Sequence, residues 1–181
     1  MTTVRAVLLL VCVMGLSAVQ KTESAPPNAD TPLSVEELKL YGDFLDSFVG
    51  KDGQLESVSL IEKTVPLILN PGDADGCLKD TGLKISKAAD QNSHSFPPSI
   101  VKDRALYLVD PKKVDPTDRQ AGVLSLSVIG FDDDHRFAVF TFRFLRSGAS
   151  GLFYERGGTV ALRKIDGRWK ETNPSCSSWI T

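Results

Sequence analysis

The chain has 181 residues, of which 41% are hydrophobic and 24% are charged, and its formal net charge is −2. This length and composition predict one globular domain with a sizeable apolar core. The near-neutral charge, with no basic stripe and no run of like charges, argues against a nucleic-acid-binding protein and against a charged tail.

The first 24 residues have the pattern of a secretory signal peptide. Arg5 precedes the apolar run 6–16, and small residues follow. That run is too short to cross a hydrocarbon core of roughly 30 Å comfortably. A membrane anchor or a buried helix is the alternative interpretation. We expect a secreted or periplasmic protein with a signal peptide at 1–24, a linker at 25–33, a single domain at 34–181, and no integral membrane segment after processing.

The first folded element predicted is a helix over residues 35–49. Ser34 and Glu37 have the spacing of a capping box, in which each side chain satisfies a backbone N–H of the other residue. Apolar residues then recur at helical spacing, namely Leu38, Tyr41, Leu45 and Phe48. Gly42 inside this run costs about 1 kcal/mol relative to alanine, so tertiary packing has to support the helix.

Two strands are predicted before the C-terminal third of the chain. Residues 54–69 are rich in β-branched side chains, and Val58 and Leu60 share one face of such a strand. A short strand precedes Pro111 in the sequence "RALYLVDP". The intervening residues carry turn and loop chemistry, with a short helix at 84–90.

The C-terminal third has the alternation of an antiparallel meander of at least four strands. Phe140, Phe142 and Phe144 share one face, and Asp166-Gly167 between two β-like runs is a strong hairpin signal. The predicted fold is therefore α+β, with an N-terminal helix packed on a curved antiparallel sheet of about four to six strands.

Two cysteines, Cys77 and Cys176, remain once the predicted signal peptide is removed. An even number in an oxidising compartment favours a disulfide between them. Two free, buried thiols are the alternative interpretation.

The sequence contains no strong catalytic or metal-binding motif. His94 and His135 are the two histidines, and the run "FDDDH" before Arg136 is interpreted as a solvated turn, because neighbouring side chains point in different directions. The residues "DADG" at 73–76 match only part of a calcium loop. A Cys176–His135 dyad is ruled out if Cys176 forms a disulfide. We therefore expect no catalytic residue, no metal site and no cofactor.

Aromatic side chains give the strongest indication of a binding site. The phenylalanine face is mainly core, but one end of a sheet that curls around a helix can form a concave pocket. Tyr154, Trp169 and Trp179 are the candidates for its rim. We expect a non-enzymatic binding or interaction module whose partner is a small apolar ligand or a protein. The alternative is a small hydrolase or isomerase with a pocket between helix and sheet.

Five short sequences in the second half of the chain carry a resemblance. They are "LVDP" at 108–111, "GVLSLSVIGFDDDHRFAVFTF" at 122–142, "GGTV" at 157–160, "GRWK" at 167–170 and "CSSWI" at 176–180. Together they resemble a group of uncharacterised exported bacterial proteins, and the resemblance implies no activity. The group often carries a cysteine pair where this chain reads "LRSGASGLFYERGG", so any metal or redox role of that pair is missing here. The ending also resembles the cone-shaped α+β fold of nuclear transport factor 2-like and cystatin-like proteins.

Overall fold

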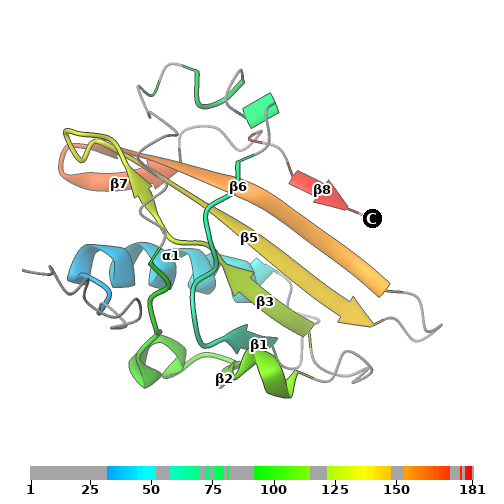
Figure 1. Ribbon diagram of the computed structural model, residues 1–181. Coiled ribbons are helices and arrows are strands. Elements are labelled where there is room, and N and C mark those ends of the chain that lie inside the picture. Colours follow the sequence, from blue (N-terminus) through cyan, green and yellow to red (C-terminus); the bar gives the residue numbers. More distant parts are fainter. Residues whose placement is uncertain are drawn as a thin grey trace, which may run out of the picture.

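The protein combines one long helix with an open sheet in an α+β architecture (Figure 1). The computed structural model describes residues 32–51, 58–69, 72–73, 76–79, 81, 92–114, 122–147, 153–171, 176 and 178–180. The predicted signal peptide and the short helix predicted at 84–90 lie outside these residues. None of the helices within these ranges has the length and apolar character needed to cross a membrane.

The long helix comes first in the chain, and the strands follow it. The helix is α1 (Val35–Lys51), and the strands are β1 (Val58–Ile61), β2 (Leu106–Val109), β3 (Gly122–Leu126), β4 (Gly130–Phe131), β5 (Phe137–Ser147), β6 (Phe153–Ile165), β7 (Arg168–Glu171) and β8 (Ser178–Ile180). Two short 3₁₀ helices, η1 (Pro98–Val101) and η2 (Pro111–Lys113), flank β2. The sheet order is β2-β1-β3-β5-β6-β7, with β4 pairing with β5 and β8 pairing with β6.

The sheet is mixed, so the prediction of a purely antiparallel sheet is wrong for the half that contains β1. Strand β1 runs parallel to both β2 and β3, whereas β3, β5, β6 and β7 are antiparallel as predicted. Parallel neighbours need a crossover of a dozen or more residues, and residues 62–105 between β1 and β2 provide one. Alternation of apolar residues shows which face is buried but carries no information about strand direction.

The predicted capping box starts helix α1. The backbone N–H of Ser34 donates to Glu37 Oε2 at 2.7 Å, and the backbone N–H of Glu37 donates to Ser34 Oγ at 3.2 Å. A Cβ atom at Gly42 would lie 3.4 Å from Arg104 Nη2, an ordinary van der Waals contact, so lack of space does not explain the glycine. Arg104 in turn donates to both carboxylate oxygens of Asp46, at 2.6 and 2.9 Å. Arg104 thus ties the helix to the chain before β2.

One face of the sheet packs against α1, as the sequence predicts. Tyr41 and Leu45 are fully buried, and the Tyr41 ring centroid lies 5.4 Å from that of Phe140. Phe48 contacts Phe142 with ring centroids 5.8 Å apart. The Tyr41 hydroxyl donates to the backbone oxygen of Ser127 at 2.6 Å, so the one polar atom of this buried ring is satisfied.

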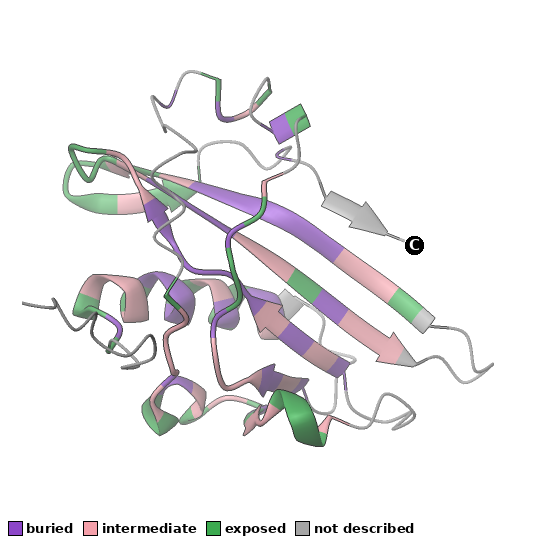
Figure 2. Cartoon of the chain, in the orientation of Figure 1, coloured by how far each residue is buried: buried purple, intermediate pink, exposed green. Residues whose placement is uncertain are grey.

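A second apolar cluster covers the opposite face of the same strands. Along β5 and β6, Val139 and Ala161 belong to this cluster, whereas their neighbours Phe140 and Val160 belong to the helix side. Its buried members are Leu67, Leu78, Val128, Val139, Ala161 and Cys176. The middle of the sheet is therefore buried on both faces, and β5 and β6 carry much of the purple colouring of Figure 2.

Candidate ligand pocket between helix and sheet

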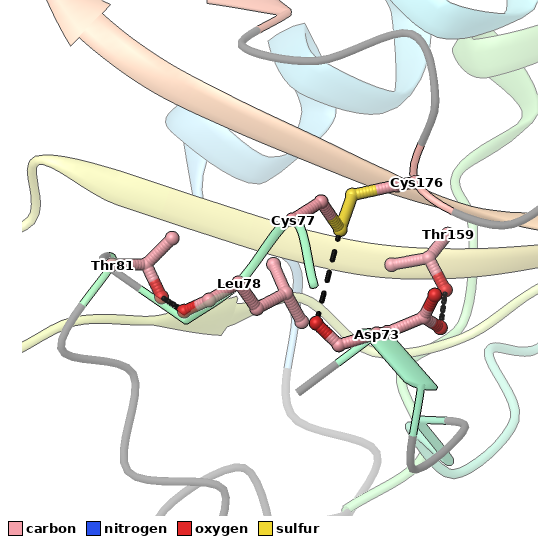
Figure 3. The surroundings of a disulfide bond; sticks show 6 residues. All are labelled: Asp73, Cys77, Leu78, Thr81, Thr159 and Cys176. Carbon is pink, nitrogen blue, oxygen red and sulfur yellow. Dashed lines mark hydrogen bonds between the residues drawn. A yellow bond between two sulfur atoms is a disulfide. The ribbon is translucent and has the colours of Figure 1, made fainter. Parts of the chain in front are cut away.

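Cys77 and Cys176 form the predicted disulfide (Figure 3), with Cα atoms 5.3 Å apart. The bridge joins the disulfide segment, by which we mean residues 72–73, 76–79 and 81, to the chain two residues before β8. A second contact reinforces it, because the hydroxyl of Thr159 on β6 donates to Asp73 Oδ2 at 2.6 Å and both residues are buried. The disulfide segment is thus fastened at two points, to β6 by this hydrogen bond and to the chain before β8 by the disulfide.

The edge of β6 is covered by two separate strands with a gap between them. Strand β7 pairs with residues 162–165 of β6, and β8 pairs with residues 156–158. Residues 159–161 lie between these two pairings, and Cys176 precedes β8 in the chain. The disulfide therefore lies near the part of β6 that neither β7 nor β8 covers.

A pocket of about 220 Å³ lies beside this gap, between α1 and the sheet. Three phenylalanine rings line it, and their centroids are 5.6 Å (Phe44 to Phe48), 5.3 Å (Phe44 to Phe142) and 5.8 Å (Phe48 to Phe142) apart. Arg156 of β6, Glu171 of β7, Ser47 of α1 and Cys176 are among the other lining residues. The pocket therefore combines aromatic walls with one cationic and one anionic side chain.

Arg156, the cationic residue of the pocket lining, contacts one of the phenylalanine rings. The guanidinium carbon of Arg156 lies 4.8 Å from the centre of the Phe48 ring, within the range of a cation–π interaction. The Cα partner of Arg146 is Tyr154, two residues from Arg156. Such diagonal neighbours lie on one face of a sheet roughly 7–8 Å apart. Two arginines thus share this end of the β5–β6 pair.

A larger groove of about 370 Å³ lies on the other face of the sheet, beside Val65 and Ile68. Hydroxyl groups of Ser125, Thr141 and Thr159 contribute to its lining. Arg143 also lines it and donates to the Glu155 carboxylate, which raises the pKa of Arg143. Phe142 is the one aromatic side chain among the residues that line this groove, whereas three phenylalanine rings, an arginine and a glutamate line the pocket beside α1, so we take that pocket as the candidate site.

The three rim residues proposed from the sequence do not lie at one place. Trp169 is the Cα partner of Lys164, ten residues along β6 from Tyr154, which corresponds to roughly 33 Å at 3.3 Å per residue. Trp179 is the Cα partner of Gly157, near the Tyr154 end. The structure therefore separates Trp169 from the other two, and the ligand-binding role of all three stays a prediction.

Trp169 belongs to a polar cluster around Glu36 near the start of α1. Trp169 Nε1 and Lys164 Nζ donate to Glu36 Oε1 at 3.0 and 2.7 Å. Nδ1 of His135 lies 3.7 Å from Glu36 Oε2, and its ring stacks on Phe131 with centroids 4.8 Å apart. The Lys164 ammonium, followed by the indole N–H, holds the pKa of Glu36 below its ordinary value. This cluster fastens α1 to the ends of two hairpins.

The acidic run before Arg136 forms a turn in which one carboxylate has a structural role. Asp132 Oδ1 accepts hydrogen bonds from the backbone N–H groups of Arg136 and Phe137, at 2.6 and 2.8 Å. The backbone N–H of His94, the other histidine, donates to Thr64 Oγ1 at 2.8 Å. Across the described ranges, no three side chains of His, Cys, Asp or Glu come together as a metal-binding group.

Comparison of the chain with protein-family models, curated proteins and solved structures finds no match. The two resemblances noted from the sequence stay predictions.

Proposed function

We propose that this protein is an exported binding module that holds a small molecule in the pocket between α1, β5 and β6. The observation that supports this most strongly is the pocket itself, with three phenylalanine rings and two opposite charges around about 220 Å³. Aromatic walls with a few converging polar groups are typical of small-molecule sites. Export is supported by the signal-like pattern of residues 1–24 and by the disulfide, since disulfides persist in oxidising compartments.

Binding accounts for this pocket better than nucleophilic catalysis does. Its lining residues offer apolar contact, a guanidinium group, a carboxylate and the hydroxyl groups of Ser47 and Thr159, with no histidine among them to act as a base. The Thr159 hydroxyl already donates to Asp73. A cysteine nucleophile needs a thiolate, but the Cys176 sulfur is bonded to Cys77. Outside the pocket, the His135–Glu36 pair is part of the cluster that fastens α1.

The test is a thermal-shift screen of the oxidised protein against single-ring fragments that are anionic, neutral or cationic. A ligand that binds only the folded state raises the melting temperature by mass action, by about 2.7 kcal/mol of stability at a hundred times its dissociation constant. The variant Ser47→Trp fills the pocket and should abolish the shift. Lys39→Trp, an exposed position on the same helix, is the control and should preserve it.

Two results would count against the proposal. One is that no fragment changes the melting temperature of the unmodified protein. The other is that Ser47→Trp responds like the control, which would place the binding elsewhere. Turnover of a bound fragment would favour the hydrolase or isomerase alternative instead.

A further inference from the structure

We infer that the Cys77–Cys176 disulfide controls the pocket, which binds its ligand while the bridge is closed and loses most of its affinity when a dithiol opens the bridge. This inference rests on the proposed binding function, because it names the regulation of the same site. Two features carry it: the bonds between the disulfide segment and the pocket lining, and the position of Cys176 between two strands.

The disulfide segment is bonded to two residues of the pocket lining. Cys176 and Thr159 both line the pocket, and each has a partner in this segment. The Cys176 sulfur is bonded to that of Cys77, and the Thr159 hydroxyl donates to Asp73 Oδ2 at 2.6 Å (Figure 3). Cys176, Thr159 and Asp73 are only 4%, 6% and 2% exposed. The segment therefore supports two residues of the pocket wall, although none of its own described residues lines the pocket.

Sheet pairing does not hold Cys176 against the pocket. Strand β7 ends at Glu171 and β8 begins at Ser178, so Cys176 lies between the two strands and belongs to neither. These strands pair with residues 162–165 and 156–158 of β6, which leaves residues 159–161 without a partner in either strand. Cys176 packs beside this part of β6, in one apolar cluster with Ala161. The disulfide is the covalent link that fixes Cys176 there.

Opening the bridge should weaken binding strongly. Without the covalent link, the small side chain of Cys176 has to hold its place at the pocket by apolar packing, and this packing has to offset the conformational entropy that the bridge had removed. A binding-competent arrangement that is populated a tenth of the time lowers the apparent affinity about tenfold. We therefore expect reduction to weaken ligand binding by about tenfold or more.

The opening step is an exchange between the disulfide and a dithiol. A thiolate of the dithiol attacks the Cys77 sulfur, because Cys77 is half-buried whereas Cys176 is buried. The S–S bond breaks, and the Cys176 sulfur leaves as a thiolate and takes up a proton. The second thiol of the dithiol then closes a disulfide within the dithiol and releases Cys77 as a thiol. The protein gains two electrons and two protons, and the dithiol is oxidised. Since disulfides persist in oxidising compartments, ligand binding is restricted to such surroundings.

The experiment measures the affinity of three forms of the protein for phenol, benzoate and benzylamine, which are a neutral, an anionic and a cationic single-ring probe. The forms are the oxidised protein, the double variant Cys77→Ser, Cys176→Ser, and the oxidised control variant Leu60→Ala. Leu60 is fully buried in β1 and lies outside the residues that line the pocket. Its truncation therefore lowers global stability and leaves the disulfide in place. Calorimetric titration at about 15 °C, close to the maximum stability of most domains, is combined with near-UV circular dichroism as the check of folding.

A probe that binds the oxidised protein should bind the double variant about tenfold or more weakly and should bind Leu60→Ala with an unchanged dissociation constant. The unmodified protein in dithiothreitol should match the double variant, and removal of the reductant should restore its affinity.

Three results would overturn the inference and leave the proposed function standing. The double variant binds like the oxidised protein, or Leu60→Ala loses as much affinity as the double variant, or the double variant is unfolded at about 15 °C. The last result would make the bridge a structural crosslink without a regulatory role. If none of the three probes binds the oxidised protein, the fragment with the largest thermal shift replaces them. A screen in which no fragment binds means that the proposed function has failed, and this inference fails with it.

Discussion

Reduction of the Cys77–Cys176 disulfide should cost a large share of the stability of this domain. The bridge closes a sequence separation of 99 residues, for which the loop-entropy relation gives about 4.7 kcal/mol at 25 °C. Cys176 is only 4% exposed and lies in the second apolar cluster, so loosening the disulfide segment also weakens packing there. Since domains are stable by roughly 5–15 kcal/mol, the reduced protein should be close to its unfolding threshold.

The assay is urea unfolding of the oxidised protein, of the reduced protein and of the double variant Cys77→Ser, Cys176→Ser. We expect the last two to be less stable than the oxidised protein by about 3–5 kcal/mol, and a reductant should not affect the double variant. Thiol labelling of the non-reduced, denatured mature protein should find no free thiol. Two labelled thiols, or a stability loss below about 0.5 kcal/mol, would refute the reasoning.

Three further substitutions test the packing of α1. Leu45→Ala, at a fully buried position, should lower the free energy of unfolding by about 2–5 kcal/mol. The exposed control Lys39→Ala should lower it by less than about 0.5 kcal/mol. Equal losses in the two variants would mean that the helix is peripheral. Tyr41→Phe leaves the backbone oxygen of Ser127 without its 2.6 Å donor and should cost about 1–3 kcal/mol, and an unchanged midpoint would contradict that bond. The pKa of Glu36 is lowered in the folded state, so the stability that it contributes is present above its unfolded value of about 4.3 and is lost as the pH falls through the folded value. Glu36→Gln should therefore reduce the acid-induced loss of stability between about pH 5 and pH 3, and an identical stability profile would exclude that role.

Local spacing explains what the sequence could predict. The capping box of Ser34 and Glu37 needs residues three positions apart, and the two hydrogen bonds are present. The hairpin at Asp166-Gly167 depends on two neighbouring residues, and both have positive φ angles, 52° and 74°. The alternation of Phe140, Phe142 and Phe144 predicted that their side chains share one face of the sheet, because successive side chains of a strand point to opposite faces. That face packs against α1.

Contacts between distant positions explain what the sequence could not predict. Glu36 and Lys164 are 128 positions apart, and no local pattern pairs them. The pocket takes Phe44 from α1, Phe142 from β5 and Arg156 from β6, so it exists only once three elements are assembled. The candidates from the sequence were the two tryptophans and Tyr154, chosen for residue type. The signal that the sequence did offer was an arginine two positions before a glycine in a predicted strand, since Arg156 and Gly158 share one face of β6 and both line the pocket.

The most direct test of the central claim is an amide NMR titration of the oxidised protein with the single-ring fragment that raises its melting temperature most. The account predicts that the largest shift changes occur at Phe44, Ser47, Phe48 and Arg156, and that they saturate with a single dissociation constant. The groove on the opposite face, reported by Ile68, should change little. Changes centred on that groove, or no saturable change at any position, would contradict the claim that the pocket between α1 and the sheet is the binding site.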